Sequence, residues 1–349
     1  MAKKPFNTRN VSRRIASKIR GRGLPKIVSL FSGAGGLDHG FKAAGFKISA
    51  AFDLSPAAIL THKRNFPRST SIAGDLRLLK PAGVAAVVRA SIPDGDRIGI
   101  IGGPPCQGFS RANTTAEAAD PRNKLPALYI EIVRELQKFF EVEFVVFENV
   151  LGMRDKKHAD AYKGLLSGLR NRGFEITEKE LCATEFGVPQ TRKRIILSAM
   201  RKGMGYGAIR PRRRKGKSNV KEAISDLPPP IYFARDLTAE NIPFHPNHWT
   251  MNPVSPRFGS DMRSNGGRCF KRLDWNKPSP TIAFGHREIH VHPNGLRRLS
   301  IFEAMRLQGF PDDFVLEGNL SEQVEQISNA VPPPVAKSVA NAIRRTLAG

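Results

Sequence analysis

The chain of 349 residues is 40% hydrophobic, which is enough for a buried core and excludes a disordered tail. Its 56 Lys and Arg outnumber 31 Asp and Glu, and the net charge of +25 favours a polyanionic partner, nucleic acid first, over a merely soluble basic surface. No apolar run approaches the roughly 18 residues of a membrane span, so we expect a cytoplasmic protein with no membrane partner.

The three cysteines, Cys106, Cys182 and Cys269, lie far apart in the chain and show neither CxxC nor His–Cys spacing. This pattern predicts neither a disulfide framework nor a structural zinc site. We therefore expect a protein of a reducing compartment that holds no metal.

The N-terminal residues 1–25 are rich in Lys and Arg and contain no acid. They are interpreted as a basic arm that either contacts phosphates or is a solvated tail without a role. From residue 26 to 199, short β-branched runs such as "KIVSLF", "RIGIIGG" and "EFVVFEN" alternate with helix-like segments. This alternation predicts βαβ units, a mostly parallel sheet with helices on both faces, and ligands at the carboxyl ends of the strands.

Two sequence signals mark helix ends in this first part of the chain. Ser55 followed by Pro56 predicts a helix start, and the glycine that ends "NRG" at 171–173 predicts a helix stop. A loop-rich, basic domain is expected over residues 200–296, where residues 201–221 hold nine Lys or Arg and no acid. Helical periodicity returns over 297–349, with a capping box at Ser300 and Glu303, and this part is expected to complete the first domain.

A glycine turn follows the first predicted strand in "VSLFSGAGGLDHGF" and precedes a helix, a geometry that brings backbone N–H groups to a ligand. It is not a dinucleotide fingerprint, because Asp38 stands where that pattern requires glycine. Asp53 and Asp75 end the next two strand runs and could accept hydrogen bonds from ribose hydroxyls and an adenine amino group. Either carboxylate could instead cap a helix.

The stretch "GGPPCQGFS" sets Cys106 directly behind two prolines, which suits a nucleophile that needs a fixed approach, although a lone buried thiol is the commoner reading. Glu148 and Asn149 end the strand run "FVVFENV", a costly position for a carboxyl group with a packing role only. Alternate positions of an extended segment, "GVPQTRKR", carry basic and amide side chains that could face a ring oxygen or a phosphate: Gln190, Arg192 and Arg194.

These segments, taken in order, resemble the motif series of the DNA cytosine-5 methyltransferases. The matching stretches are "FSGAGG", "GDL", "GGPPCQGFS", "DPRNKL", "FENV", "GVPQTRKR", "RRLSIFEAMRLQGFPDDF" and "QISNAVPPPVA", over roughly residues 27–199 and 297–343. The resemblance implies a Rossmann-like S-adenosylmethionine-dependent fold over 26–199 plus 297–349. It implies a smaller target-recognition domain over 200–296, double-stranded DNA as substrate and a monomer. It also raises, as a partner, a restriction endonuclease that acts on the same site.

The resemblance implies a mechanism that the chemistry of cytosine demands. Carbon 5 is a poor nucleophile, and a thiolate at Cys106 that adds to carbon 6 makes it electron-rich. Glu148 would neutralise charge near N3, and Arg192 and Arg194 would hold the exocyclic oxygen and favour the thiolate. The target base must leave the duplex for this to happen. The catalytic positions implied are Cys106, Gln107, Glu148, Asn149, Arg192 and Arg194.

The same resemblance assigns an S-adenosylmethionine site, with S-adenosylhomocysteine as product. Phe31, Gly33, Gly35 and Gly36 would form the cradle, and Asp53, Asp75, Leu76, Pro105, Asn329 and Val331 would complete the site. Three positions depart from the usual pattern: Asp53 replaces a common glutamate, Ser328 a glycine, and Ser29 an acid.

Three alternatives remain open at this stage. "RCFKRLDW" at 268–275 contains Cys269-Phe270, a partial likeness to the relatives that methylate tRNA, although Lys271 breaks the motif. A non-catalytic DNA-binding relative is the second alternative, against which the filled catalytic positions argue. A nicotinamide-dependent oxidoreductase is the third, and it lacks the glycine fingerprint and leaves the charge unexplained.

Overall fold

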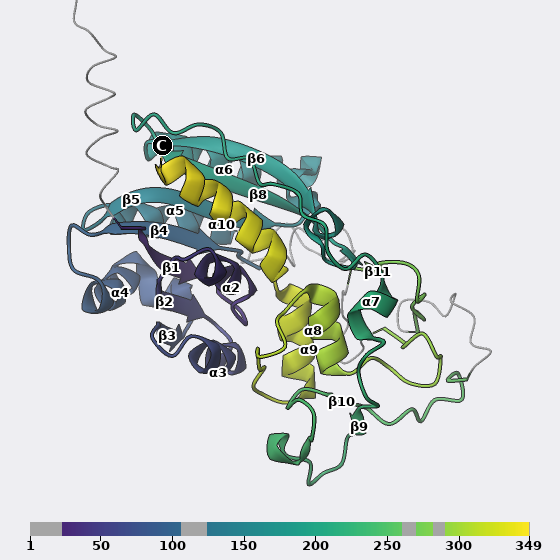
Figure 1. The fold of residues 1–349 in the computed structure, drawn as a ribbon. Coiled ribbons are helices and arrows are strands. Elements are labelled where there is room, and N and C mark those ends of the chain that lie inside the picture. The colour runs from purple at the N-terminus through teal and green to yellow at the C-terminus, as the bar shows by residue number, and fades with distance from the viewer. Residues whose placement is uncertain (1–22, 106–123, 260–269, 282–289, 349) are drawn as a thin grey trace, which may run out of the picture.

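The computed structural model describes residues 23–105, 124–259, 270–281 and 290–348, and its centre is a seven-stranded sheet (Figure 1). The strand order is β3-β2-β1-β4-β5-β8-β6, in which β8 alone runs antiparallel to its neighbours. The strands are β1 Lys26–Leu30, β2 Ile48–Asp53, β3 Thr70–Ala73, β4 Arg97–Gly102, β5 Glu141–Asn149, β6 Phe174–Cys182 and β8 Lys193–Arg201. The predicted Rossmann-like α/β fold with a mostly parallel sheet is thereby confirmed.

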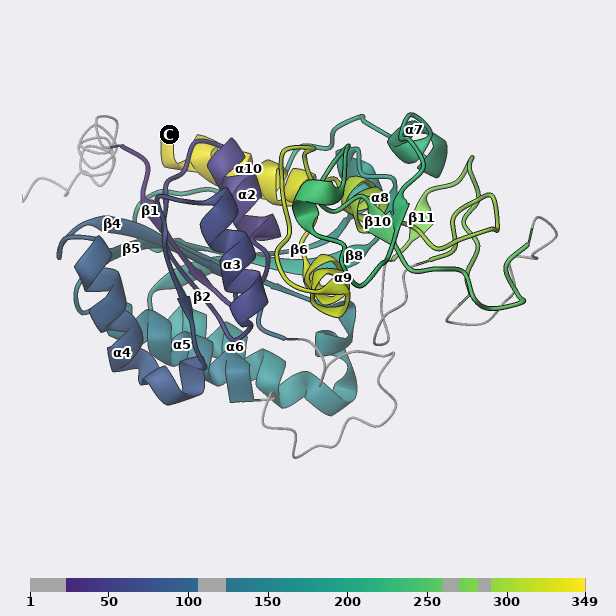
Figure 2. The same cartoon turned by 90° about the horizontal axis from the view of Figure 1, so that it is seen from below.

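Helices cover both faces of this sheet, as Figure 2 shows from below. One face carries α2 Gly36–Ala43, α3 Pro56–Asn65 and α10 Pro333–Ala348, and the other carries α4 Leu76–Ser91, α5 Leu125–Leu136 and α6 Ala159–Asn171. Successive residues of β1 point to opposite faces, so Ile27 enters one hydrophobic core and Val28 the other. The pairing of β1 with β2 shifts by one residue after Ile27, and Ile48 accordingly joins the first core while Ala50 and Phe52 join the second. Burial on both faces explains why the strands read as continuous apolar runs.

The helix signals in the sequence are confirmed. Ser55 caps α3 through its hydroxyl, which accepts a hydrogen bond from the Ala58 N–H at 3.3 Å, and Pro56 is the first helical residue. α6 ends at Asn171, and Gly173 beyond it has a φ of 86° that suits glycine. Ser300 and Glu303 form the predicted capping box of α8, Ile301–Gln308. Local signals therefore set these helix ends.

The C-terminal helices return to the body of the fold, as the sequence predicts. α8 and α9, Leu320–Asn329, lead into α10, which packs directly on α2. This contact depends on Gly40, where a Cβ would overlap Ala336. The end of the chain thus covers one face of the sheet.

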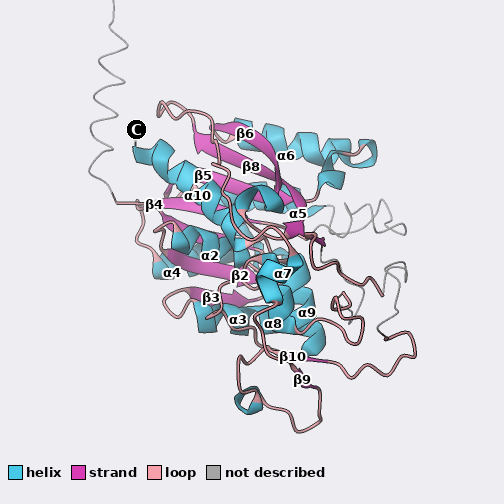
Figure 3. Ribbon diagram, turned by 45° about the vertical axis from the view of Figure 1, so that its right-hand side comes forward, coloured by secondary structure: helices cyan, strands magenta, loops and turns pink. Residues whose placement is uncertain are grey.

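The middle of the chain is mainly loop, as the pink trace beside α7, β9 and β10 in Figure 3 shows. Its short elements are α7 Val220–Ile224, β9 Ile231–Tyr232, η5 Ala239–Asn241, β10 Trp249–Thr250 and β11 Ser279–Pro280. β11 pairs with β7, Gln190–Thr191. Three further turns of 3-10 helix lie between β5 and β7: η2 Leu151–Arg154, η3 Lys156–His158 and η4 Ala183–Phe186. The division of the chain into 1–25, 26–199 plus 297–349, and 200–296 stays a prediction. The backbone contacts of residues 209–216 with β6, η4 and α10 favour a boundary nearer to Ser218.

Candidate active site

The carboxyl ends of β4 and β5 lie side by side and bring two sequence motifs together. The strands pair in parallel up to Gly102 opposite Phe147, so the chain leaves both at the same edge of the sheet. A Cβ at Gly103 would lie 2.7 Å from Glu148 Oε2, a space that only glycine leaves open. The Asn149 side-chain amide donates to the Pro104 carbonyl at 3.2 Å. Residues 103–104 are therefore held against Glu148 and Asn149.

Two predicted catalytic residues, Cys106 and Gln107, lie outside the described residues. The chain is described up to Pro105, which is exposed and follows the two positions that contact β5. Cys182, a free cysteine within the described residues, lies at the end of β6, and its sulfur is 3.1 Å from Thr184 Oγ1. The predicted role of Cys106 thus stays a prediction, supported by the position of the residues just before it.

Glu148 is buried, with 7% of its surface exposed, and faces Arg194. The Arg194 Nε atom lies 3.1 Å from Glu148 Oε1 in an ion pair. Burial raises the pKa of Glu148 above its ordinary value, and the nearby Arg194 and Arg192 guanidiniums oppose this shift without cancelling it. The carboxyl group therefore keeps a proton to higher pH than an exposed glutamate does.

The two predicted arginines have different partners. While Arg194 faces Glu148, the buried Arg192 donates from Nη2 to the Ser328 carbonyl at 2.8 Å. Gln190 is fully buried and donates to Gln308 Oε1 at 2.7 Å. Gln308 in turn donates to the Ala330 carbonyl at 2.7 Å. The segment "GVPQTRKR" is thereby tied to the end of α8 and to the residues just before Val331.

Gln308 belongs to the site's supporting network, and sequence reasoning missed it. Its position within "RLQGFP" was noted as part of the resemblance, but no residue-level signal assigned it a partner. The sequence carries no signal of this role, since only the structure shows that Gln308 is fully buried at the end of α8, where a buried amide needs hydrogen-bond partners.

The glycine turn between β1 and α2 adopts backbone conformations that few residues tolerate. Phe31, Gly33 and Gly35 have φ values of 54°, 52° and 90°, and a Cβ at Gly33 would meet no atom within 4 Å. A Cβ at Gly36 would overlap the Val331 carbonyl, so the turn packs closely on the C-terminal segment. Asn329 is exposed nearby in the sequence. The turn therefore has a closed side and an open side, the latter suited to a ligand.

Asp53 stabilises this turn from the end of β2. Its carboxylate accepts hydrogen bonds from the Gly33 N–H at 2.7 Å and the Ser55 N–H at 2.9 Å. Burial raises the pKa of Asp53, and these two backbone donors partly offset the effect. The carboxylate is consequently fixed in position by backbone groups rather than by flexible side chains.

Asp75 caps a helix, which is one of the two readings that its sequence position allowed. Its side chain accepts from the Arg77 N–H at 2.8 Å at the start of α4. Hydrogen bonds from the Arg77 guanidinium lower the pKa of Asp75, so the group is ionised near neutral pH. Leu76, the next residue, is buried. An ionised cap at a strand end can still accept a hydrogen bond from an amino group.

A buried polar network lies beneath the glycine turn. The Ser29 hydroxyl donates to Asp38 Oδ2 at 3.0 Å. The other oxygen, Asp38 Oδ1, lies 3.2 Å from His62 Nε2, and His62 Nδ1 lies 2.8 Å from Ser71 Oγ. Asp38 and His62 are both fully buried. Asp38, in the first turn of α2, therefore joins β1 to α3 beneath the glycine turn.

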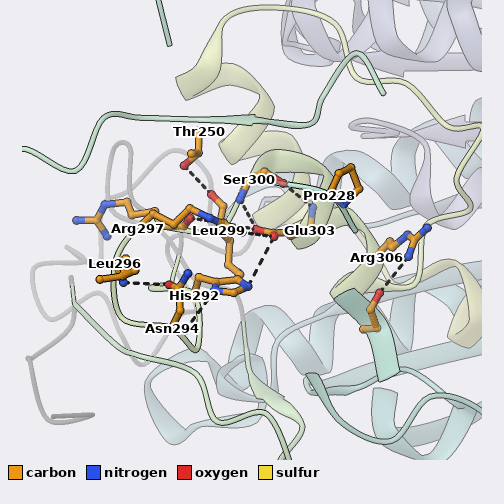
Figure 4. Close-up of polar contacts among 12 residues, drawn as sticks. Pro228, Thr250, His292, Asn294, Leu296, Arg297, Leu299, Ser300, Glu303 and Arg306 are labelled. Carbon is orange, nitrogen blue, oxygen red and sulfur yellow. Dashed lines mark hydrogen bonds and ion pairs between the residues drawn. The ribbon is translucent and has the colours of Figure 1, made fainter. Parts of the chain in front are cut away.

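A second polar cluster joins the middle region to α8 (Figure 4). The Arg297 guanidinium forms two hydrogen bonds with Glu303, at 2.8 and 2.7 Å, and Glu303 closes the capping box with Ser300. His248 Nε2 lies 2.7 Å from the Pro228 carbonyl, which only accepts, so Nδ1 accepts from the Ser300 hydroxyl at 2.9 Å. Burial lowers the pKa of His248, consistent with a neutral ring. Sequence reasoning identified the cap but not these partners.

Comparisons with known proteins decide the family. The family model described as C-5 cytosine-specific DNA methylase matches residues 25–345. The chain belongs to this family. Two similar curated proteins are the type II methyltransferases M.MthTI of Methanothermobacter thermautotrophicus and M.NgoPII of Neisseria gonorrhoeae. The first is 33% identical over 93% of this chain and 98% of its own length, and the second is 31% identical over 92% and 96%.

Solved structures agree with the fold of the methylase. A crystal structure from E. coli described as a prophage-encoded DNA modification methyltransferase is 26% identical, with a TM-score of 0.74 over 93% of this chain and all of that one. S. pombe Dnmt2 methyltransferase, at 18% identity and a TM-score of 0.63, supports the fold alone. Within the described residues of the methylase, no helix is long and apolar enough to cross a bilayer, and no group of three His, Cys, Asp or Glu could bind a metal.

Proposed function

We propose that the methylase uses the Cys106 thiolate to add to carbon 6 of a cytosine in duplex DNA. As the sulfur–carbon bond forms, the 5,6 double bond shifts and carbon 5 becomes the electron-rich carbon of an enamine. The observation that carries this proposal is the contact between Gly103, three residues before Cys106, and the Glu148 carboxylate. After methylation, loss of the carbon 5 proton and elimination of the thiolate restore the double bond and free Cys106.

Glu148 is proposed to neutralise the charge that thiolate addition creates on the ring. A carboxyl group with a raised pKa can donate a proton or a hydrogen bond to N3 as that nitrogen becomes more basic. Asn149, held by the Pro104 carbonyl, is proposed to keep the residues before Cys106 in register with Glu148. General acid catalysis of this kind contributes about 10²- to 10⁴-fold to a rate.

Arg194 is proposed to contact the exocyclic oxygen of the cytosine and to favour the thiolate form of Cys106. Its guanidinium lies beside Glu148, so a ring that contacts the carboxyl group also comes within reach of Arg194. Arg192 is proposed to be a positioning residue. Its side chain donates to the Ser328 carbonyl and thereby fixes the segment that leads to Val331. Gln107 is proposed to stabilise the loop that carries Cys106.

The glycine turn is proposed to bind S-adenosylmethionine, which when bound supplies an electrophilic methyl group. The residues fit this cofactor, because Gly33 has open space beside it and the turn offers backbone N–H groups at the start of α2. Asp53 would accept hydrogen bonds from the ribose hydroxyls and Asp75 from the adenine amino group. Phe31, Leu76, Pro105, Asn329 and Val331 would border the pocket, together with Gly35 and Gly36.

The DNA is proposed to deliver its target cytosine by rotation out of the helix, because a stacked base leaves no room for attack at carbon 6. The middle region is proposed to read the surrounding sequence with the polar side chains of its loops. The relatives named as type II methyltransferases support a role as the modification enzyme of a restriction-modification system. A cognate endonuclease, a monomeric state and a cytoplasmic location belong to the same proposal.

The decisive experiment is bisulfite sequencing of DNA that the purified protein has methylated in vitro. Protected cytosines at one position of a common sequence would show the target base and the recognition site together. Tritium transfer from labelled cofactor into duplex DNA and tRNA, measured side by side, tests the tRNA alternative. Label in tRNA alone would contradict the proposal.

The role of Cys106 is tested by Cys106→Ser, with Cys182→Ser as the matched control. We expect Cys106→Ser to abolish methyl transfer while DNA binding changes by less than about threefold, because a hydroxyl is a far weaker nucleophile at neutral pH. Duplexes with 5-fluorocytosine at the target should trap the wild-type protein covalently, since no proton can leave carbon 5. A fully active Cys106→Ser protein would end the thiolate hypothesis.

A further inference from the structure

The basic run that follows β8 lies on the catalytic domain, although the sequence places it in the recognition region. The Ile209 N–H donates to Thr177 Oγ1 of β6 at 3.1 Å, and the Arg214 N–H donates to the Glu185 carbonyl of η4 at 2.9 Å. Side chains of α10 also bind this segment: Ser338 donates to the Arg212 carbonyl at 2.7 Å and Arg345 to the Arg210 carbonyl at 3.3 Å. Figures 1 and 2 both show the segment running beside α10 toward α7.

Close backbone packing fixes the end of this run. A Cβ at Gly216 would lie 2.7 Å from the Gly187 Cα, and a Cβ at Gly187 would lie 2.8 Å from the Gly216 Cα. Two glycines therefore let the run lie directly on the turn that leads into "GVPQTRKR". Because backbone groups make these contacts, the side chains of the run remain available to a partner.

The exposed side chains along this path are almost all cationic. We call them the basic strip, which comprises Arg210, Arg212, Arg213, Arg214, Lys215 and Lys217, together with Arg344 and Arg345 of α10. Residues 201–221 and 331–349 contain no acid. Glu185 pairs with Arg213 at 2.8 Å, yet the Arg213 side chain remains 80% exposed. The strip thus presents a row of cations to solvent.

Such a row costs stability unless an anion neutralises it. Burial and the neighbouring Arg212 and Arg344 lower the pKa of Arg345, which records like charges held close together. Hydrogen bonds from Arg345 and Ser338 hold the strip against this repulsion. A fold that arranges backbone contacts to keep cations in a row is suited to a linear polyanion.

We propose that the basic strip binds the phosphates of duplex DNA that flanks the target site, outside the contacts that hold the target cytosine. The two α10 residues that hold the strip, Ser338 and Arg345, are seven residues apart, or about 10 Å along the helix, roughly three phosphate spacings of 3.4 Å along one strand. Beyond Ser338 the strip continues to η4, next to the segment that carries Arg194. This inference rests on the proposed function, which supplies duplex DNA as substrate.

The test compares duplexes of two lengths, 14 and 40 base pairs, each with the site found by bisulfite sequencing. The variant Arg210→Gln/Arg212→Gln/Arg214→Gln removes three charges from exposed side chains, and it leaves the backbone contacts in place. We expect affinity for the 40-base-pair duplex to fall roughly tenfold at 100 mM salt, and the slope of log K against log salt to become shallower by about 2 to 3. For the 14-base-pair duplex, affinity and kcat should change less than about twofold.

Two further variants control for net charge and for folding. Lys47→Gln/Lys63→Gln/Arg68→Gln removes three exposed charges at the other end of the sheet order and should leave the salt slope for the long duplex unchanged. Arg210→Lys/Arg212→Lys/Arg214→Lys keeps the charges and should retain the wild-type slope. Thermal melting of each variant verifies that the fold is intact.

Three outcomes would overturn the inference. They are a strip variant with the wild-type slope on the 40-base-pair duplex, an equal loss on both duplexes, and an equal loss in the Lys47, Lys63 and Arg68 control. A wild-type protein that binds random 40-base-pair DNA through the strip but methylates no duplex would contradict the proposed function and leave the strip standing.

Discussion

Two carboxylates lie at strand ends of the same sheet, Glu148 buried and Asp53 partly buried, and they differ in what holds them. Asp53, at the end of β2, is fixed by two backbone N–H groups, whereas Glu148, near the end of β5, faces the Arg194 side chain and the open position of Gly103. Burial raises the pKa of both groups. In the proposed mechanism the two groups have different tasks: Asp53, fixed by backbone donors, accepts hydrogen bonds from a ribose hydroxyl, and Glu148, with its raised pKa, donates a proton.

The largest expected effect comes from Glu148→Gln, which removes the acid at the β5 end. We expect kcat to fall about 10²- to 10³-fold with DNA affinity within about threefold, because the amide cannot protonate N3. The matched control is Glu143→Gln on the same strand, a buried acid bonded to Arg97 at 2.8 Å and to Tyr206 at 2.9 Å. The control should reduce stability while kcat in folded protein stays near wild type. Equal losses of rate and affinity in Glu148→Gln would indicate a structural role only.

At the β2 end, the network beneath the glycine turn should matter most for stability. Asp38→Asn replaces one carboxylate oxygen by an NH2 donor between the buried Ser29 and His62, so one of these partners must reorient or lose its hydrogen bond. We expect the free energy of unfolding in urea to fall by about 2 to 3 kcal/mol. A second substitution that restores an acid on β1, Ser29→Asp with Asp38→Ser, should recover part of this loss. No recovery would mean that the position of the acid on α2 is itself required.

A smaller effect is expected from Asp53→Asn, which keeps the shape of the side chain but changes its hydrogen bonding. We expect KM for S-adenosylmethionine to rise about tenfold, or about 1.4 kcal/mol, with kcat at saturation within about twofold. Asp94→Asn serves as the control, since Asp94 is an exposed partner of Arg89. A fall in kcat without a change in KM would break the distinction between the two carboxylates.

The smallest effect is the pH dependence of stability from Glu148. The folded protein holds a proton on Glu148 to higher pH than the unfolded chain, so the stabilisation is complete below the ordinary pKa of 4.5 and is lost as pH rises through the raised pKa. The melting temperature of the wild type should therefore fall relative to that of Glu148→Gln as pH rises, by less than about 3 °C. Divergence in the opposite direction would show that Arg194 dominates over burial.

Most strands of residues 26–199 and several helix ends could be predicted from the sequence because their signals are local, whereas β6, with its charged and partly exposed residues, was not predicted. Apolar runs bounded by turn residues indicated the strands, and Ser55 and Ser300 indicated helix starts through hydrogen bonds that span three residues. The sequence left open whether Asp75 binds an adenine amino group or caps a helix. The structure shows that it caps α4 and pairs with Arg77. For Arg192 and Arg194, alternation predicted a shared side, while their partners come from β5 and from Ser328, remote in the chain.

By itself, the amino-acid sequence determined the fold class, the order of the motifs and the residue types available for chemistry, because periodicity, caps and motif spacing act over a few residues. Tertiary structure alone decided that Gly103 lies against Glu148, that Asp38 lies between Ser29 and His62, and that the basic run lies along α10. Each of these depends on contacts between segments distant in the chain, whose pairing follows from strand order and helix packing rather than from local propensity.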